Sequence, residues 1–559
     1  MPNKTLYESF REIANENKSK TAVMWKENKR WKRKNYKTIL REIDAFASAL
    51  EKMKVKEMDR VAIFSENRKE WLISDFAINK IGAISVPIHT TSNEDTFHYC
   101  LKDSDTDLVI ASEKCIEKLN SWKKIKKLRI ISFDGDKKAK GCKNFYFYDL
   151  IESNQRENVD TRKNKKDIAS IVYTSGTTGE PKGVILTNTN FISNIEGVYE
   201  RLEIRRDDLF LSFLPLSHVL ERTATQFVAT MRGATIAYCE GIKKITDNMM
   251  ELNPTIIVSV PKIFEKFYEK VLSELKKNPK KEKLFYWALK KKTFLARTFG
   301  DKVVLKKVRN KFGKNLRFAV SGGASIDSRI IKFFDKLGVN VIEGYGLTET
   351  SPIIGVNSLD DKKVGTIGKP LENVEVKIGH DKELLVRGPS ITSGYWKKKE
   401  MTAEAIDKDA WFHTGDLVFM DSERNISIIG RKKEIIVTNN GKDVAPERIE
   451  SSLNLSPYIL QSVVIGHKKP FLSALIVPDQ EALVNTDIDT NSIDELTSLI
   501  QKEVHKINKE LMHHEQIEKF ILMRAPFTLE AGELTPTMKI RRSIIENKCH
   551  NLIKGIYEK

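Results

Sequence analysis

Cysteine is scarce in this chain, with only five among 559 residues. The five positions are scattered, and no two of them are spaced as CxxC. Disulfide-dense domains and structural zinc sites need closely spaced ligands, so the sequence predicts neither of them. A reducing compartment fits this cysteine usage best, and we therefore expect a cytoplasmic protein.

Long apolar runs are also missing, because no stretch of about 18 uninterrupted apolar residues occurs. The first four residues contain no apolar segment, and Pro2 stands where myristoylation requires glycine. The last four residues offer no cysteine for prenylation. We therefore expect no membrane-spanning helix, secretory signal or simple lipid anchor, and at most a peripheral contact with the inner face of a membrane.

Glycine and proline are modest in number, at 28 and 16 residues, which excludes a collagen or a low-complexity scaffold. Hydrophobic residues make up 40% of the chain, enough for packed cores. A length of 559 residues exceeds one ordinary core and predicts roughly three or four structural units. No repeat of fixed period occurs, so solenoids and propellers are not expected.

The charge is distributed unevenly along the chain. The net charge is +19, yet residues 431–559 contain 18 basic and 18 acidic residues, so residues 1–430 carry the whole excess. Residues 26–37 form a basic cluster that contains Trp31 and directly follows Trp25. No nucleic-acid-binding motif accompanies this cluster, and we expect no nucleic-acid partner.

Short apolar runs alternate with helix-length segments, which is the pattern of strands and crossover helices in a parallel sheet. The runs include residues 61–64, 83–86 and 108–111, and the helical segments include residues 37–52 and 71–81. The sequence therefore predicts an α/β fold with a large N-terminal body of parallel-type sheets.

Two smaller units are expected after this body. Short strands at 374–378 and 383–386, separated by turn residues, predict a small antiparallel β element within residues 365–420. From residue 426 onward, strand candidates at 426–429, 434–437, 460–465 and 473–477 mix with helices near 446–453 and 494–511. We divide the chain into an N-terminal domain, 1–430, and a small, mobile α+β C-terminal domain, 431–559.

A loop rich in glycine and hydroxyl groups lies between two predicted strands, at 167–173 and 184–186. Such a loop allows close backbone approach and supplies N–H and O–H donors and a terminal cation, as a polyphosphate requires. It is not a Walker A loop, because Lys182 precedes glycine instead of serine or threonine. The loop residues are Thr174, Ser175, Gly176, Thr177, Thr178, Gly179, Glu180, Pro181, Lys182 and Gly183.

This loop resembles the phosphate loop of the adenylate-forming superfamily, which includes acyl-CoA synthetases, luciferase-like ligases and peptide-synthetase adenylation domains. Further blocks follow in the family's order and extend the resemblance over nearly the whole chain. They are residues 214–218 (LPLSH), 321–324 (SGGA), 343–350 (EGYGLTET), 411–417 (WFHTGDL), 430–434 (GRKKE), 440–442 (NGK) with 446–450 (PERIE), and 534–539 (LTPTMK). Two departures, Ala410 and Met538 where relatives often have glycine, remove no functional side chain.

The chemistry of the 343–350 block fits a nucleotide site. Tyr345 offers an aromatic face for adenine, Thr348 a hydroxyl for phosphate, and Glu349 one carboxylate for Mg²⁺, which prefers few protein oxygens together with water and phosphate. The resemblance implies the same assignments. It further implies that Asp416 accepts the ribose hydroxyls, and that the ATP- or AMP-binding set also includes Gly323, Ala324, Glu343, Gly344, Gly346 and Arg431.

Four further assignments concern the reaction itself. By resemblance, His218 lines the end of the pocket that receives the acyl carboxylate, although a hydrogen-bonded core histidine is the alternative. Lys539 is the lysine that drives adenylation, where a cation neutralises carboxylate and phosphate oxygens as they approach. The resemblance also places an interdomain hinge at Lys433 and the loop for the CoA step at Gly441.

A helical, basic segment at 271–312 indicates which branch of the superfamily the chain resembles, because it is similar to an insertion of the long-chain fatty acyl-CoA synthetases. It combines Lys276, Lys277, Lys280, Lys281, Lys283, Lys290, Lys291 and Lys292 with the apolar run 284–289. This mixture suits an anionic membrane surface, and an ordinary solvated helix pair is the alternative.

The resemblance implies a long-chain fatty acid:CoA ligase that uses ATP, Mg²⁺ and CoA and forms an acyl-adenylate. The nearest alternative is a ligase that loads acyl carrier protein, an acidic partner that a basic body could dock. A peptide-synthetase module is disfavoured because only 20 residues follow Lys539. An inactive scaffold would be expected to lose Lys539, Glu349 or Asp416, and all three are present.

Overall fold

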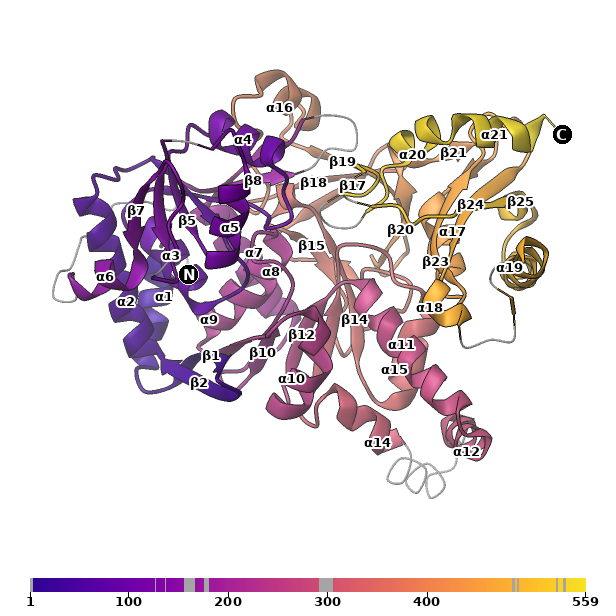
Figure 1. The fold of residues 1–559 in the computed structure, drawn as a ribbon, viewed down its shortest axis with the longest axis horizontal. Helices are drawn as coiled ribbons and strands as arrows, with labels where there is room; N and C mark the ends of the chain where they lie inside the picture. Colours follow the sequence, from indigo (N-terminus) through magenta and orange to yellow (C-terminus); the bar gives the residue numbers. More distant parts are fainter. Residues whose placement is uncertain are drawn as a thin grey trace.

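The structure is a computed structural model that describes residues 4–125, 127–135, 137–154, 166–174, 180–290, 305–484, 488–489, 492–528, 531–535 and 539–558. A broad N-terminal body, indigo to salmon in Figure 1, is joined to a smaller orange and yellow C-terminal unit at its upper right. This arrangement confirms the predicted α/β class with a large body and a separate C-terminal unit.

The first large sheet has seven strands in the order β7-β6-β5-β3-β4-β8-β9. All neighbours are parallel except β8 and β9, which pair as an antiparallel hairpin around the glycine-rich loop. Most strands are buried along their length, as the continuous apolar runs predict for a sheet covered on both faces. Their bounds are β3 Arg60–Phe64, β4 Ile84–Pro87, β5 Leu108–Ala111, β6 Arg129–Ser132, β7 Lys143–Tyr146, β8 Ile168–Thr174 and β9 Lys182–Thr187.

The second large sheet has nine strands in the order β16-β15-β14-β13-β12-β10-β11-β1-β2. Its centre is parallel, and antiparallel strands close both edges. Their bounds are β1 Thr21–Glu27, β2 Arg30–Asn35, β10 Leu209–Ser212, β11 Thr235–Tyr238, β12 Ile256–Ser259, β13 Phe318–Ser321, β14 Val341–Gly346, β15 Ile353–Val356 and β16 Lys369–Pro370.

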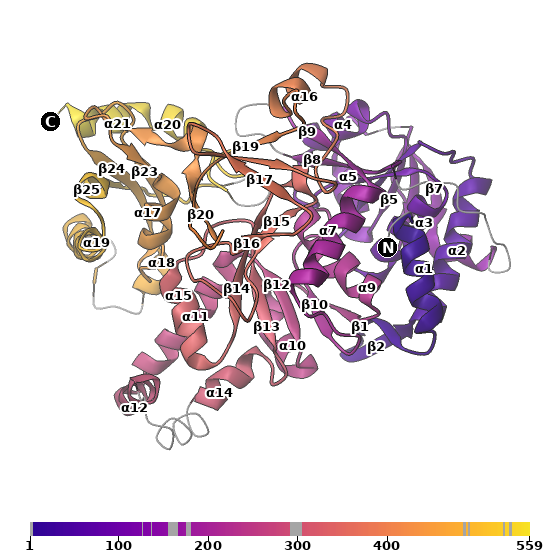
Figure 2. The same ribbon diagram turned by 180° about the vertical axis from the view of Figure 1, so that it is seen from behind.

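Helices pack around these two sheets (Figures 1 and 2). The predicted helices at 37–52 and 71–81 are confirmed as α2 and α3, which pack against each other. The α-helices of the body are α1 Leu6–Glu16, α2 Tyr36–Lys52, α3 Lys69–Lys80, α4 Glu94–Asp103, α5 Glu113–Ser121, α6 Phe147–Glu152, α7 Asn188–Arg201, α8 Val219–Glu221, α9 Val228–Arg232, α10 Ile245–Leu252, α11 Pro261–Lys276, α12 Pro279–Lys290, α14 Lys306–Arg309, α15 Ser328–Leu337 and α16 Lys399–Ala405. A π-helix, η1 Arg222–Phe227, joins α8 to α9, and 3-10 turns lie at η2 Ile242–Lys244, η4 Asn310–Phe312, η5 Thr348–Thr350 and η6 Lys432–Glu434.

The small antiparallel β element is confirmed as a four-stranded sheet in the order β17-β18-β19-β20. Its strands are β17 Glu375–Ile378, β18 Glu383–Arg387, β19 Phe412–Met420 and β20 Ile426–Arg431. Figure 2 shows this sheet between the body and the C-terminal unit. The candidate strand at 426–429 does not begin the C-terminal fold, because β20 pairs with β19 from Asp416 to Met420.

The C-terminal unit is α+β, as predicted, with its own hydrophobic cores. Its three-stranded sheet, β23-β24-β25, is covered by helices, and the predicted helix at 446–453 is α17. The predicted strand at 434–437 is shorter, since residues 432–434 form a 3-10 turn. The elements are β21 Ile436–Val437, β22 Asp443–Val444, α17 Pro446–Leu453, β23 Ile459–Ile465, β24 Leu472–Pro478, α18 Gln480–Leu483, α19 Ile493–Asn508, η7 His513–Glu515, β25 Ile517–Leu522, α20 Arg542–Lys548 and α21 His550–Tyr557.

The helical insertion takes the form of α11 and α12 followed, after residues outside the description, by α14 and η4. Helix α12 projects from the lower right of the body (Figure 1). Among the helices that the structure describes, none is both long enough and apolar enough to cross a bilayer.

Candidate active site

The phosphate-loop hairpin is held by the pairing of β8 with β9. Thr174 and Lys182 face each other at its open end, and residues 175–179 between them lie outside the described part of the chain. The predicted contacts of Ser175, Gly176, Thr177, Thr178 and Gly179 therefore stay predictions. Gly183 next to Lys182 allows close packing, because a Cβ there would lie 2.7 Å from the Ile171 side chain.

The 343–350 block begins on β14 and ends in the turn η5. Gly346 must be glycine, because a Cβ at this position would lie 1.6 Å from the carbonyl oxygen of Pro352. The turn therefore folds tightly and brings Thr348 and Glu349, both half-buried, beside the strand ends. Gly323, which follows β13, has a φ of +84°, a left-handed conformation that favours glycine.

Glu343 faces inward from β14 and is buried. Its carboxylate accepts a hydrogen bond from the Gly365 N–H at 3.0 Å. Burial raises the pKa of Glu343 to about 7, against the opposing effects of this hydrogen bond and of Lys362. The side chain thus ties β14 to the loop that leads into the small antiparallel sheet.

Tyr345, Asp416 and Arg431 converge on one point although they come from three strands. The Tyr345 hydroxyl donates a hydrogen bond to Asp416, and Arg431 Nε lies 2.8 Å from the other carboxylate oxygen. Burial raises the pKa of Asp416, while Arg431, Tyr345 and Lys539 act in the opposite direction. Strand register explains the meeting, since Asp416 on β19 pairs directly with Arg431 on β20.

His218 caps the first turn after β10, and the Leu220 N–H donates to its Nδ1 at 3.2 Å. Burial, followed by the electrostatic effects of His89 and Lys539, lowers the pKa of His218 to about 3. The ring is therefore neutral near pH 7, and with Nδ1 accepting a bond, Nε2 carries the proton. A neutral N–H donor suits the binding of a carboxylate or carbonyl oxygen.

His89 is a neighbour that the sequence did not reveal. Its ring centre lies 6.3 Å from that of His218, and its Nδ1 lies 2.8 Å from the Ser217 hydroxyl. Burial lowers the pKa of His89 to about 4. His89 follows β4 in the other large sheet, so no local pattern links it with the 214–218 motif.

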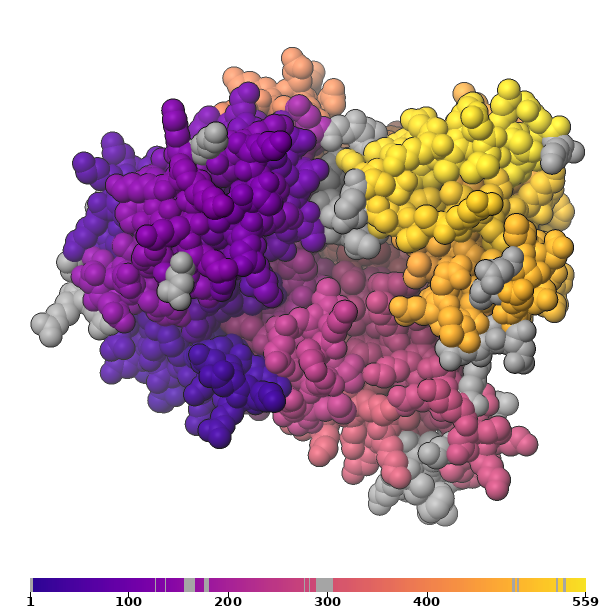
Figure 3. Space-filling model, viewed as in Figure 1, coloured from indigo at the N-terminus to yellow at the C-terminus, as the bar shows by residue number. Residues whose placement is uncertain are grey.

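Lys539 approaches this region from the C-terminal unit. Its backbone carbonyl accepts from the Thr535 N–H at 2.8 Å, and its own N–H donates to the Thr535 hydroxyl at 3.0 Å. The side chain is exposed, and its charge acts on both His218 and Asp416. Figure 3 shows the surface hollowed where the purple, magenta and yellow parts of the chain meet.

Arg222 is a second residue whose importance sequence reasoning missed. It lies in the π-helix just after His218, and its Nε donates to Asp75 of α3 at 2.9 Å. Its other nitrogens donate to the hydroxyls of Ser170 on β8, at 2.7 Å, and Ser85 on β4, at 2.6 Å. This buried network ties the His218 segment to the strand that leads into the phosphate loop. Only the tertiary fold brings these four residues together.

Two neighbouring lysines in the segment between the two units differ in their side-chain partners. Lys432 lies 2.5 Å from Asp381 and 3.0 Å from Glu383, both of the small antiparallel sheet. Lys433 is exposed, and no hydrogen bond of its side chain to another described residue is present. Gly441 has a φ of +68° and lies in an open turn. A Cβ at this position would have no atom within 4 Å except those of its chain neighbours.

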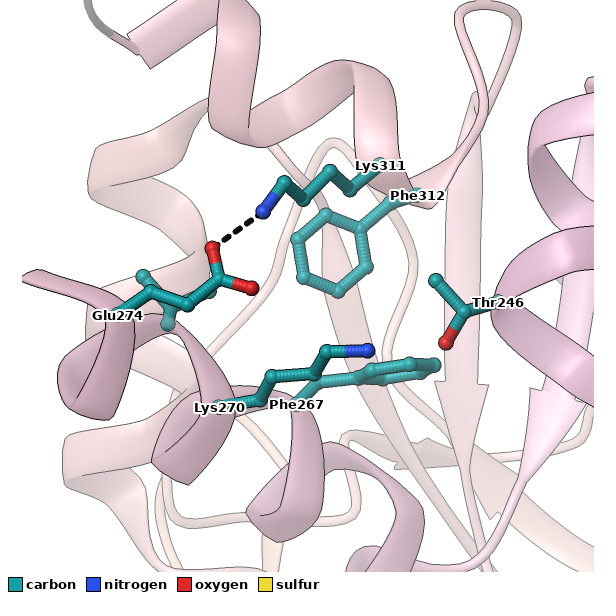
Figure 4. A pocket seen from close by; sticks show the side chains of 7 residues that line it. Thr246, Phe267, Lys270, Glu274, Lys311 and Phe312 are labelled. Atoms are coloured by element: carbon teal, nitrogen blue, oxygen red, sulfur yellow. Dashed lines mark hydrogen bonds and ion pairs between the residues drawn. The ribbon is translucent and has the colours of Figure 1, made fainter. Parts of the chain in front are cut away.

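The small, partly open cavity in Figure 4 lies away from these residues. It is lined by α10, α11 and η4, and its volume of about 20 Å³ suffices for a single water molecule. The ion pair between Lys311 and Glu274 closes one side of it. This cavity is therefore not a substrate site.

Comparisons with known proteins identify the family of the chain. Residues 10–396 match the model of the AMP-binding enzyme family, and residues 433–559 match that of the AMP-binding enzyme C-terminal domain. The chain is 36% identical to the long-chain-fatty-acid-CoA ligase FadD15 of Mycobacterium bovis, over 93% of this chain and 91% of that protein. It is 30% identical to long-chain-fatty-acid-CoA ligase 5 of Rattus norvegicus, over 99% and 89% respectively.

Solved structures show the same fold at lower identity. The adenylation domain of a carboxylate reductase from Mycobacterium chelonae superposes with a TM-score of 0.84 at 20% identity, covering 100% of this chain and 92% of that one. The anthranilate CoA ligase AuaEII in complex with anthranoyl-AMP gives 0.78 at 21% identity, covering 99% of each chain. The chain belongs to the AMP-binding, adenylate-forming enzyme family, in its long-chain fatty acyl-CoA ligase branch.

Proposed function

We propose that this protein is an ATP-dependent long-chain fatty acid:CoA ligase. The fatty acid carboxylate attacks the α-phosphate of ATP and expels pyrophosphate, and the CoA thiol then attacks the carbonyl of the acyl-AMP and releases AMP. Neither step needs a protein nucleophile. Attack on a polyanion needs positioned cations and donors instead.

One observation carries the proposal. The charge of Lys539 acts on both His218, at the proposed acyl end, and Asp416, at the proposed ribose end. A lysine whose charge reaches both groups is suited to stabilise charge where carboxylate and α-phosphate meet. The neutral His218 is suited to donate Nε2–H to the acyl oxygen, and Asp416 with Tyr345 and Arg431 to hold the nucleoside.

Mg²⁺ is the metal that this chemistry requires, and the residues present fit it. Tyr395 donates to Glu349 Oε1 at 3.0 Å, and no described residue forms a hydrogen bond with Oε2. Among the described residues no cluster of three or more metal-binding side chains occurs. One carboxylate oxygen, completed by phosphates and water, matches the preference of Mg²⁺. Bound Mg²⁺ would neutralise phosphate charge as pyrophosphate departs.

We further propose that the domain boundary lies at 430/431 and that rotation occurs at Lys433. Two features support this. Both lysines are exposed, but Lys432 forms ion pairs with Asp381 and Glu383 of the body, whereas Lys433 forms none with a described residue. Rotation there would withdraw Lys539 and bring the open turn at Gly441 to the acyl-AMP for the CoA step.

A membrane contact through α12 is a finer proposal. Leu284, Tyr286 and Trp287 are between 38% and 43% exposed on this projecting helix, and Lys283 beside them is exposed. Lys291 and Lys292, which the sequence assigns to the same basic surface, lie outside the described residues, as do the side chains of Lys276, Lys281 and Lys290. Exposed aromatic residues among lysines suit an anionic lipid surface.

Pyrophosphate release, measured across fatty acids of graded chain length with and without CoA, tests the main proposal. We expect release that depends on a long-chain acid, and acyl-CoA as product. An acyl carrier protein ligase is the second candidate, supported by the positive charge of residues 1–430. Competition between purified CoA and acyl carrier protein for the same acyl-AMP distinguishes them. No acid-dependent release with any acid would refute both.

A further inference from the structure

A strap at residues 392–396 joins two motifs of the site that lie far apart in the sequence. It runs along β9, the strand after the phosphate loop, and also contacts the turn that carries Glu349. The hydrogen bonds run from Ile185 N–H to Gly394 O (3.0 Å), from Trp396 N–H to Gly183 O (2.7 Å), from the Thr392 hydroxyl to Ile185 O (2.6 Å) and from Thr392 N–H to Glu349 O (2.8 Å).

Tyr395, at the centre of this strap, contacts a charged residue of each motif. Its hydroxyl donates to Glu349 Oε1 at 3.0 Å, and its ring centre lies 5.0 Å from Lys182 Nζ. The side chain is only 8% exposed, so its orientation is fixed by packing. One tyrosine therefore touches both the proposed metal carboxylate and the lysine of the phosphate loop.

The contacts of Tyr395 do not neutralise the charges of Lys182 and Glu349. An aromatic face holds the ammonium of Lys182 without neutralising it, as a carboxylate would. A phenol holds Glu349 through one oxygen and leaves its negative charge for a cation. No ion pair between Lys182 and a carboxylate is present among the described residues. Both charges thus remain available to a polyphosphate and its metal ion.

We propose that Tyr395 is a positioning residue that holds Lys182 and Glu349 apart and directs both toward the phosphates of ATP. The inference rests on the proposed function. Without the ring, the lysine and the glutamate would be free to pair with each other and lose their ligands. Without the hydroxyl alone, only the metal carboxylate would lose its support.

Two variants separate these effects in a binding measurement that needs no turnover. Calorimetric titration of ATP into the full chain, without fatty acid or CoA, is carried out with MgCl₂ and with EDTA. For Tyr395→Phe we expect unchanged affinity in EDTA and a loss of about tenfold in the gain that Mg²⁺ gives, the effect of one hydrogen bond to a charged group. For Tyr395→Leu we expect weaker binding in EDTA as well, because Lys182 loses its ring.

The matched control is Tyr199→Phe. Tyr199 lies on α7, outside the site, and its hydroxyl donates to the Val228 carbonyl of α9 at 2.8 Å. This control should bind ATP as the wild type does under both conditions. If Tyr395→Phe kept the full gain from Mg²⁺, or if Tyr395→Leu bound ATP normally in EDTA, the inference would be wrong while the proposed function stood. If the wild-type chain bound no ATP, both would fall.

Discussion

Lys539 and His218 lie in different units of the molecule, yet the charge of the lysine contributes to the low pKa of the histidine, after burial and His89. This electrostatic effect links a residue of the C-terminal unit with a residue of the body, as our proposal for the adenylation step requires. The charge of the same lysine also lowers the pKa of Asp416, against the larger effect of burial. Several consequences of this geometry are open to experiment.

Glu349→Gln and Thr348→Ala should each slow acyl-adenylate formation by roughly 100-fold or more, since both remove contacts that act on the phosphates in the transition state. The two residues share the turn η5. Pyrophosphate release at saturating fatty acid measures this step. Near-normal release by Glu349→Gln would remove the turn from the active site.

Glu221 gives the protein a pH-dependent stability. Burial raises its pKa from 4.5 to about 8, so between these values the folded state holds a proton that the unfolded state has lost. The stability contributed by this proton is fully present below about pH 4.5 and is lost as pH rises toward 8. Glutamine does not titrate. The free energy of unfolding of Glu221→Gln should therefore rise by about 3 kcal/mol relative to that of the wild type between about pH 5 and pH 8. Urea midpoints of both proteins at the two pH values give the difference, and parallel midpoints would contradict the prediction.

Leu284→Ser and Trp287→Ser should weaken binding to anionic vesicles, if α12 is the membrane contact. The binding should also fall with added salt, because screening acts over about 8 Å at physiological ionic strength. Phe419→Ser is a suitable control, since Phe419 is 62% exposed on β19. Co-sedimentation with phosphatidylserine vesicles measures the effect. Equal binding by all variants would favour an ordinary solvated helix.

The sequence predicts the fold class correctly, because the fold class depends on local patterns. Buried strands read as continuous apolar runs, and α17 follows from Pro446 at its first position. The sequence did not predict how far the small antiparallel sheet extends, since the pattern of β20 is that of any half-buried strand. Only pairing with β19 assigns it to the body.

The contacts within the site could not be predicted in the same way. The motifs at 343–350 and 411–417 each predict a nucleotide contact, but neither indicates that Tyr345 donates to Asp416. Arg222 and Tyr395 have partners that lie far from them in the sequence, so no spacing along the chain identifies these contacts. Their signal is tertiary: a guanidinium buried to 1% exposure and a phenol between two opposite charges.

Lys433→Pro should spare adenylation and impair the CoA step, because the proline ring fixes φ near −65°, which restricts rotation at the proposed hinge. The adenylating arrangement would still be reached. Conversion of synthetic acyl-AMP and CoA to acyl-CoA in a single turnover measures the impaired step. A normal rate would show that the rotation occurs elsewhere.

Lys539→Ala tests the central claim, that one site performs two chemically separate steps and that this lysine serves only the first. Single-turnover assays start either from fatty acid, ATP and Mg²⁺ or from synthetic acyl-AMP and CoA. We predict that the variant forms almost no acyl-AMP, a loss of roughly 100-fold or more, yet converts supplied acyl-AMP to acyl-CoA at nearly the wild-type rate. Equal loss of both half-reactions would contradict the account.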